Sequence, residues 1–514
     1  MNGAQKLIQT LAHNGVDLVV GNPGTSEMQF VHALDSSPNV RAVLALFEGV
    51  VTGAADGYAR MADRPAATLL HLGPGLGNGL ANLHNARRAR TPIVNVVGDH
   101  ATYHKRFDAP LNSDIESVAR TFSSWVRTST SAASIGADAA AAVTAARTPP
   151  GQIATLVLPA DVAWSEADGP PEKATVPGAA RVPQSIVDEI AQVVRRGEPT
   201  ALLLGGHVAR ERHVQAAARI AKHTGARVLC DTFPTRIERG AGRPTIERLP
   251  YFGEMVLGAL AGIKHLIVVG TKAPVAFFAF PGKPSELVPE GCTLHTLAGE
   301  AADCAHALEA LADALGAKES PNVQPPFVPS APTGGAIDPS VLAYAIAATL
   351  PERAIVVDEG NTTSFAVPMA TAGCGPHDWL SLTGGSIGMG LPAAAGAALA
   401  CPDRRVLALE GDGSAMYTIQ ALWTQSRESL AVTNVILANR SYAILNLEMM
   451  RMGLGEAGPV ARQMLDLRRP DLDFVAMGRS MGVPSVRVTT GDELAAELRK
   501  SHATPGPSLI EVVL

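Results

Sequence analysis

The 514-residue sequence is poor in cysteine, in aromatic residues and in charge of one sign. Its five cysteines include no CxxC pair, which indicates buried thiols in a reducing compartment rather than disulfides or a zinc site. Aromatic residues make up only 4% and the net charge is −6 with acids and bases interspersed, so no nucleic-acid partner is expected. Because no apolar run reaches membrane-spanning length and the first residues lack a signal-peptide layout, we expect a cytoplasmic protein with no membrane partner.

What the sequence does contain is a repeated alternation of apolar strands and amphipathic helices. The length implies about three domains, and the alternation is typical of α/β units built on parallel sheets. We therefore predict three doubly wound parallel-sheet domains at residues 1–165, 184–315 and 337–514. The proline-rich stretches 166–183 and 316–336 are expected to be linkers between them.

A strand–helix–strand unit in the third domain carries the first group of candidate residues. The strand VLALEGDG ends at Asp412, and the strand VTNVILAN ends at Asn439. Because the two strands should be parallel neighbours, these side chains are expected at the same edge of the sheet. With the carbonyl of Ser441 they form a set of hard oxygen ligands suited to Mg²⁺ that holds a diphosphate. An Asp-Gly pair at a strand end is also a common turn, and it is the correctly spaced Asn439 that favours the metal site.

Three turns in the first domain carry the second group. Thr25 lies in the glycine-rich loop GNPGTSE, Glu48 begins the helix EGVVTGAADGYAR, and His71 precedes the turn LGPGLGN. Each residue also has a structural explanation, since an acid in a first helical turn favours the helix dipole and a lone histidine is often a core residue. His100 and His104, in a polar loop, are weaker candidates for catalysis. Only the combination of the three turns indicates an active site.

Together these stretches resemble the thiamine diphosphate enzymes of the acetolactate synthase, pyruvate oxidase and benzoylformate decarboxylase superfamily. The resemblance spans the whole chain, in the order pyrimidine-binding, central and diphosphate-binding domain. Its most specific parts are GDGS at 411–414 followed by Asn439, the helix that begins at Glu48, and GGSIGMGLPAAAGAALA at 384–400.

The resemblance implies thiamine diphosphate and Mg²⁺ as cofactors. Asp412, Asn439 and the Ser441 carbonyl would ligate Mg²⁺, Glu48 would bind the pyrimidine, and Ile387 would be the apolar wedge beneath the cofactor. Because pyrimidine and diphosphate are held by different subunits in this superfamily, a homodimer or homotetramer with active sites at the subunit interface is implied. The other cofactor-binding positions would be Gly385, Gly411, Gly413, Ser414, Asn361, Thr362 and Tyr442.

The resemblance further implies decarboxylation of a 2-oxo acid. Ala279 stands where benzoylformate decarboxylase has a histidine, which favours carboligation to a second carbonyl, as in acetolactate synthase, over release of an aldehyde. His71 and Thr25 are the candidates for handling protons and the substrate carboxylate. Ile444 and Leu445 would line the substrate pocket and favour small or medium apolar acyl groups. FAD is not expected, because the central domain is short and lacks the corresponding motif.

The sequence argues against two other functions. A catalytically silent partner subunit would have no physical need to keep Glu48, Asp412 and Asn439 together. A nicotinamide-dependent dehydrogenase would use the central domain, where GGHVARER at 205–212 follows a strand but lacks GxGxxG. The decarboxylase and carboligase functions are therefore favoured over both.

Overall fold

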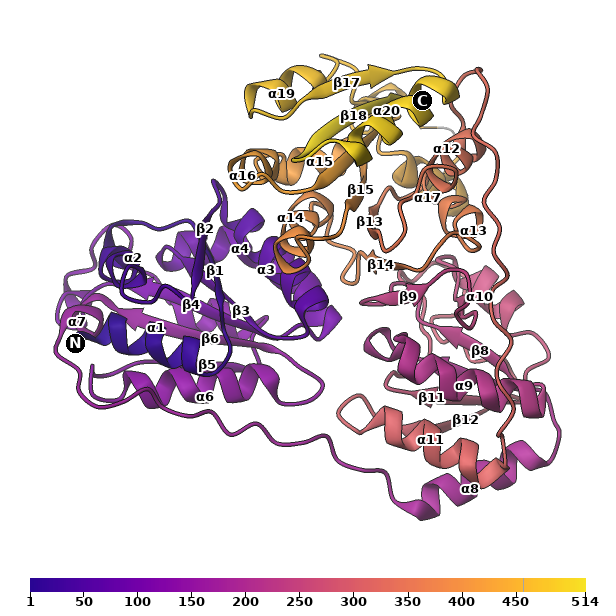
Figure 1. The fold of residues 1–514 in the computed structure, drawn as a ribbon, viewed down its shortest axis with the longest axis horizontal. Helices are drawn as coiled ribbons and strands as arrows, with labels where there is room; N and C mark the ends of the chain where they lie inside the picture. The colour runs from indigo at the N-terminus through magenta and orange to yellow at the C-terminus, as the bar shows by residue number, and fades with distance from the viewer. Residues whose placement is uncertain (456) are drawn as a thin grey trace.

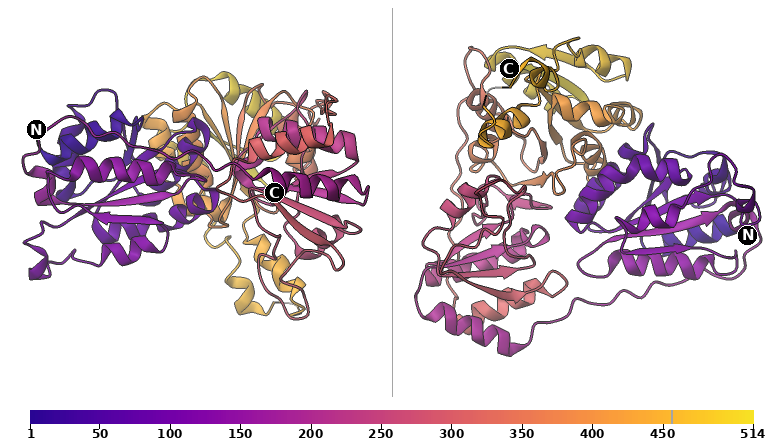
Figure 2. Two further views of the ribbon diagram at one scale, coloured as in Figure 1. Left: turned by 90° about the horizontal axis from the view of Figure 1, so that it is seen from below. Right: turned by 180° about the vertical axis from the view of Figure 1, so that it is seen from behind.

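The computed structural model describes residues 1–455 and 457–514 and contains three α/β units, each built on a largely parallel sheet (Figure 1). The predicted fold class is thereby confirmed. Figure 2 shows the first unit (indigo to purple) and the central unit (magenta to pink) flanking the third (orange to yellow). Over the described residues, no helix is both long and apolar enough to cross a membrane.

The first unit is a six-stranded parallel sheet in the order β2-β1-β3-β4-β6-β5. Its four inner strands are buried throughout, as expected for a sheet covered by helices on both faces, whereas the edge strands β2 and β5 are partly exposed. Its elements are α1 (Gly3–His13), β1 (Leu18–Gly21), η1 (Thr25–Glu27), α2 (Met28–Leu34), β2 (Arg41–Leu44), α3 (Glu48–Ala62), β3 (Ala66–Leu70), α4 (Leu72–Ala89), β4 (Ile93–Asp99), η2 (Lys105–Phe107), α5 (Ile115–Arg120), β5 (Trp125–Thr128), α6 (Ile135–Arg147), β6 (Ile153–Pro159) and α7 (Ala160–Trp164).

The central unit is a five-stranded parallel sheet in the order β10-β8-β7-β11-β12. It is joined to its neighbours by the described stretches 165–183 and 316–338, which contain no helix or strand, and the first of these runs along the outside of the molecule to α8 (Figure 1). Its elements are α8 (Gln184–Arg195), β7 (Thr200–Leu204), η3 (Gly206–Val208), α9 (Glu211–Thr224), β8 (Arg227–Cys230), β10 (Glu247–Arg248), α10 (Gly253–Ala259), β11 (His265–Val269), β12 (Thr293–Ala298) and α11 (Cys304–Leu315).

The third unit is a seven-stranded sheet in the order β17-β18-β16-β15-β13-β14-β9. The predicted pairing of the two strands around the GDGS turn is confirmed, since β15 and β16 are parallel neighbours. The single helix expected between them is instead two short helices. The elements are α12 (Pro339–Ala347), β13 (Ile355–Glu359), α13 (Val367–Ala370), β14 (His377–Ser381), α14 (Gly390–Ala400), β15 (Val406–Gly411), α15 (Asp412–Thr418), α16 (Ala421–Arg427), β16 (Val432–Ala438), α17 (Ala443–Arg451), α18 (Pro459–Gln463), α19 (Phe474–Ser480), β17 (Ser485–Val488), α20 (Gly491–Ala503) and β18 (Ser508–Val513).

One strand of the third sheet comes from the middle of the chain. Strand β9 (Ile237–Arg239) pairs antiparallel with β14. Just before it, the buried Arg236 donates its Nε to Asp378 Oδ1 of β14 at 2.6 Å and its NH1 to the carbonyl of Arg60 in α3 at 3.2 Å. The sequence did not predict this strand, because three residues carry no recognisable alternation and their partner lies far along the chain.

Helices α3 and α14 join the first unit to the third at backbone contact distance. A Cβ on Gly57 of α3 would lie 2.1 Å from the carbonyl oxygen of Ala393, and a Cβ on Gly396 of α14 would lie 1.9 Å from that of Ala54. Only glycine permits so close an approach. The contact places the first turn of α3 next to the loop that precedes α14, since Asn82 donates to the carbonyls of both Gly49 and Gly388.

One buried and one partly buried histidine, His377 and His502, make the stability of the fold sensitive to acid. His377 and His502 each hold one backbone carbonyl through Nδ1, at 2.9 and 3.0 Å, while each Nε2 is buried without a partner. Burial lowers the pKa of each ring from 6.5 to about 4. Between these values the unfolded chain binds more protons than the folded one, so the free energy of unfolding falls as the pH drops from about 6.5 to about 4.

We expect each ring to contribute about 2 kcal/mol less stability at pH 5 than at pH 7. The double variant His377→Asn/His502→Asn keeps a donor near each Nδ1 position but cannot titrate. Its Tm should therefore fall less than that of the unaltered protein between pH 7 and pH 5, as measured by differential scanning calorimetry. Equal decreases in the two proteins would show that other groups govern the acid response.

Candidate active site

The carboxyl edge of the first sheet gathers the candidates of the first unit. Thr25 follows β1 and is exposed, Glu48 follows β2 as the first residue of α3, and His71 follows β3 as the residue before α4. His100 follows β4 and its ring lies 5.5 Å from that of His104, on an exposed loop. Parallel strand order alone brings these turns together.

His71 is held by a buried carboxylate that the sequence analysis did not select. Its Nδ1 lies 2.8 Å from Glu27 Oε2, which also accepts the N–H of Gly24 at 2.8 Å, while Ser26 donates its hydroxyl to Oε1 at 2.6 Å. Gly24 lies against the His71 ring, where a Cβ would approach Nδ1 to 2.2 Å. The Glu27 side chain is fully buried and that of His71 is 24% exposed, so the pair fixes the ring while leaving its other edge accessible.

Glu48 is buried at the start of α3 with one of its oxygens engaged. Its Oε2 accepts the Nδ2 of Asn78 at 3.0 Å. Gly75 faces the other oxygen, since a Cβ there would lie 3.2 Å from Oε1. The N-terminus of a helix favours a negative charge, so this carboxylate is stabilised without a cationic side chain beside it.

The loops after β15 and β16 form the predicted oxygen-rich edge of the third sheet. Asp412 is buried and accepts the N–H of Gly413 at 2.8 Å and that of Arg440 at 2.5 Å. Asn439 Oδ1 accepts the N–H of Ser441 at 3.0 Å. Burial raises the pKa of Asp412, a cost that a bound divalent cation offsets.

These loops fit a diphosphate and its metal. A Cβ on Gly413, the second residue of α15, would lie 2.5 Å from the ring of Tyr442, so a larger residue there would displace that ring. Asn361 donates its Nδ2 to the Ser414 hydroxyl at 3.3 Å, which places two polar groups beside the same helix start. In the described ranges, no group of three or more His, Cys, Asp or Glu side chains is placed to hold a metal ion.

The loop 384–390 carries Gly385 and Ile387 and is held by two hydrogen bonds from α4. Asn82 of α4 donates to the carbonyl of Gly388 at 3.0 Å, and Asn85 donates to that of Ser386 at 2.8 Å. Gly385 has φ +72°, which favours glycine. Ile387 is half-buried against the core. Thr362, after β13, is half-buried.

Two buried acids beneath this loop were not selected from the sequence. Glu359 and Glu410 are neighbours in register on β13 and β15. Glu359 accepts the N–H groups of Gly388 at 2.6 Å and Gly390 at 2.5 Å. Burial and the adjacent Glu359 raise the pKa of Glu410 well above its usual range, so one proton is retained by the pair. The sequence signal for this pair of buried acids was an acidic residue inside each of two apolar runs, AIVVDEG and VLALEGDG.

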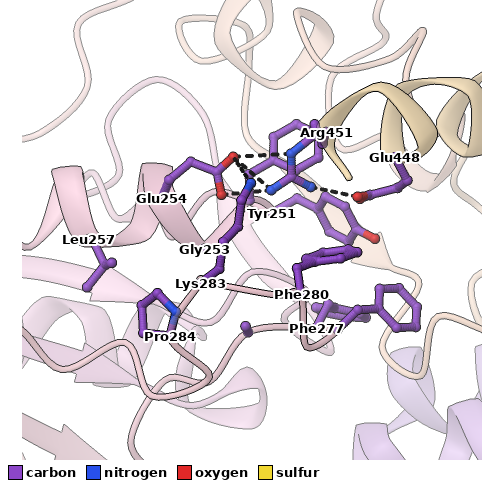
Figure 3. Close-up of a pocket in the computed structure, with 13 residues that line it drawn as sticks. Tyr251, Gly253, Glu254, Leu257, Phe277, Phe280, Lys283, Pro284, Glu448 and Arg451 are labelled. Carbon is purple, nitrogen blue, oxygen red and sulfur yellow. Dashed lines mark hydrogen bonds and ion pairs between the residues drawn. The ribbon is translucent and has the colours of Figure 1, made fainter. Parts of the chain in front are cut away.

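The expected substrate-pocket residues lie near, but not in, an aromatic cavity of about 110 Å³ between the central unit and α17. Ile444 is half-buried and Leu445 is 47% exposed at the start of α17. Ala279 is exposed, and its neighbours Phe278 and Phe280 line the cavity instead. Figure 3 shows the cavity with Glu448 and Arg451 at its upper side.

Comparisons with known proteins match both ends of the chain and its whole length. The model of the thiamine pyrophosphate enzyme N-terminal TPP binding domain matches residues 1–118, and that of the C-terminal TPP binding domain matches residues 358–512. IlvX of Mycobacterium tuberculosis, provisionally described as an acetolactate synthase large subunit, is 58% identical over 100% of this chain and 99% of its own. Benzoylformate decarboxylase of Pseudomonas aeruginosa is 31% identical over 98% and 97%. The solved thiamine diphosphate-dependent 4-hydroxybenzoylformate decarboxylase of Rhodococcus jostii superposes with a TM-score of 0.88 at 27% identity, covering 100% and 99%.

Proposed function

Because the chain belongs to the thiamine pyrophosphate enzymes, we propose that it decarboxylates a 2-oxo acid with thiamine diphosphate and Mg²⁺ and joins the remaining acyl unit to a second carbonyl. The observation that carries this proposal is the pairing of β15 with β16, which puts Asp412 and Asn439 at one sheet edge. Thiamine diphosphate supplies a carbanion-stabilising electron sink when bound. Asp412, Asn439 and the Ser441 carbonyl would hold the metal, and Glu48 would hold the pyrimidine.

The residues around the loop 272–284 favour carboligation over release of an aldehyde. Protonation of the acyl unit requires a donor on that side of the site, and Ala279 cannot supply one. Its aromatic neighbours Phe277, Phe278 and Phe280 are equally unable to donate a proton. Without a proton donor at position 279, attack of the acyl unit on a second carbonyl is the favoured outcome.

Aldehyde release is the second candidate, and the aromatic cavity favours it. Benzoylformate decarboxylase and 4-hydroxybenzoylformate decarboxylase are named for arylglyoxylates, and this chain resembles both over its whole length. In that case His71, whose ring is held by Glu27, would donate the proton to the acyl unit.

We further propose that the active site is completed by a second copy of the chain. Leu46, Tyr103 and Phe107 are 48%, 61% and 61% exposed at the carboxyl edge of the first sheet, on the segments that follow β2 and β4. Such apolar groups at a site edge are suited to cover by a partner. The homo-oligomer would bring Glu48 of one subunit to the diphosphate loops of another.

Product identity tests the two candidates. The protein with Mg²⁺ and thiamine diphosphate is incubated with pyruvate or with benzoylformate, and the acid-quenched reactions are analysed by proton NMR. Acetolactate from pyruvate is the expected result. Benzaldehyde from benzoylformate as the sole product would establish the second candidate. Bound cofactor with no loss of either acid, or of a wider panel of 2-oxo acids, would contradict both and indicate a silent homologue.

Glu27 is expected to act through His71. Glu27→Gln should lower kcat by about tenfold to a hundredfold, because the ring loses the carboxylate that orients it. If the effect passes through His71, adding Glu27→Gln to His71→Ala should cause no further decrease in kcat. Steady-state kinetics on the four proteins of this cycle make the measurement. Independent, multiplicative decreases would show that Glu27 only supports the loop.

A further inference from the structure

The cavity of Figure 3 is walled by aromatic rings from the central unit. Tyr251, Phe252, Phe277, Phe278 and Phe280 line it. The rings of Tyr251 and Phe277 lie 5.2 Å apart between centroids, and both pack against Phe233. These rings contact one another at tilted and edge-to-face angles and give the cavity an apolar lining, and a volume of about 110 Å³ limits an occupant to about one ring.

The two sides of the cavity belong to segments that flank the proposed cofactor site. Phe277 reaches toward Gly385, where a Cβ would lie 3.4 Å from its ring. Helix α17, on the other side, begins directly after Tyr442, whose ring covers Gly413. Ile444 and Glu448 are four residues apart on α17 and therefore share a helix face. Ile444 therefore lies one helical turn from Glu448, toward Tyr442.

The far end of the cavity is polar and already neutralised. Arg451 donates its NH1 to Glu448 at 2.8 Å and its Nε and NH2 to Glu254 at 2.7 to 3.1 Å, while its guanidinium lies 4.0 Å from the centroid of Phe252. Lys283 reaches Glu254 at 3.5 Å. Two acids therefore balance two bases, and each of the three guanidinium nitrogens of Arg451 donates at least one hydrogen bond.

Glu448 retains capacity to accept a hydrogen bond. Its side chain is only 8% exposed, whereas that of Glu254 is 51% exposed. A carboxylate can accept about four hydrogen bonds, and Arg451 supplies one to Oε2. The Tyr251 hydroxyl lies beside Glu448, and burial together with this carboxylate raises the pKa of Tyr251.

Resting on the proposed function, we propose that Glu448 and Arg451 determine acyl-group specificity. They would select 2-oxo acids whose flat acyl group ends in an uncharged hydrogen-bond donor, such as a phenol hydroxyl. The donor would bond to Glu448 without displacing Arg451 and would compete only with the Tyr251 hydroxyl. A terminal carboxylate would have to displace Glu254 or Glu448 from Arg451, and an unsubstituted ring would leave the Glu448 acceptor unused.

The test compares benzoylformate, 4-hydroxybenzoylformate and 4-carboxybenzoylformate as substrates of the holoenzyme. Loss of the 2-oxo acid is followed, so that aldehyde release and carboligation count equally. We expect kcat/KM to be about tenfold to a hundredfold higher for the hydroxyl than for the unsubstituted acid, and lowest for the carboxylate. In Glu448→Gln the hydroxyl preference should fall, because one of the two acceptor oxygens is replaced by an NH₂ group that cannot accept a hydrogen bond.

Glu254→Gln is the matched control, since it makes the same change to the outer, half-exposed partner of Arg451 and should keep the preference. Tyr251→Phe removes the donor beside Glu448 and should increase the preference, which provides a test should Glu448→Gln fail to fold. Equal preference in the unaltered protein and Glu448→Gln, or an unchanged preference in Tyr251→Phe, would overturn the specificity role.

Binding of the inert analogues benzoate and 4-hydroxybenzoate to the holoenzyme, measured by calorimetry, separates this inference from the proposed function. Tighter binding of the hydroxyl compound that Glu448→Gln weakens supports the site even without turnover. Turnover of all three acids at ratios unaffected by Glu448→Gln would contradict the specificity role and leave the proposed function standing.

Discussion

Replacing Glu48 with glutamine is expected to lower kcat by about a hundredfold to ten-thousandfold while the cofactor remains bound. The carboxylate is buried, one oxygen is held by Asn78 and the other faces Gly75, so glutamine fits the same space without the charge. The charge is what holds a proton on the pyrimidine that this residue would contact. Loss of the 2-oxo acid at saturating Mg²⁺ and thiamine diphosphate gives kcat, and calorimetry gives cofactor affinity.

Glu247→Gln serves as the control for this change. Glu247 is half-exposed at the edge of the central sheet and pairs with Arg227, far from the proposed site, so kcat should not change. A Glu48→Gln protein with near-normal kcat, or one that loses cofactor and kcat together, would show that Glu48 is a structural helix-start residue.

Asp412→Ala is expected to weaken binding of Mg²⁺ and thiamine diphosphate by more than a hundredfold. Asp412 supplies the only negative charge among the three proposed ligands, and hard divalent cations depend on such a charge. Saturation with ligand at 100 times its Kd stabilises a protein by about 2.7 kcal/mol. The unaltered protein should therefore show a higher Tm with both cofactors present, and the variant should not.

Asp412→Asn distinguishes the effect of the negative charge on metal binding from the effect of Asp412 on the order of the loop. The aspartate also orders its surroundings by accepting the N–H groups of Gly413 and Arg440, and asparagine keeps one such acceptor. Loss of the cofactor-induced rise in Tm in both variants would support a metal ligand. Retention of the rise in Asp412→Asn would assign the residue to loop order alone.

The sequence predicted the features that depend on local patterns. Buried strands ending in glycine-bearing turns identified the three parallel sheets and placed Thr25, Glu48 and His71 after neighbouring strands of one sheet. The 27-residue spacing between Asp412 and Asn439 predicted the pairing of β15 with β16. These inferences succeed because a parallel strand–helix–strand unit leaves little freedom in where the strand ends lie.

Features that depend on contacts between distant segments were not predicted. Glu27 reaches His71 across 44 positions, and its role follows only from the neighbouring order of β1 and β3. Glu359 and Glu410 come together because β13 and β15 are in register. The link between Glu254 and Arg451 joins two units of the chain, and no periodicity in either segment indicates it.

Strand β9 has a consequence for synthesis of the chain. Arg239 leaves the ribosome 138 positions before His377, its partner on β14, which corresponds to roughly 7 to 28 s at elongation rates of about 5 to 20 residues per second. During that interval the edge strand has no sheet to join, and the third sheet cannot be completed until it docks. During this interval the nascent central unit carries an unpaired strand, and β9 is the segment that a chaperone would shield from other chains.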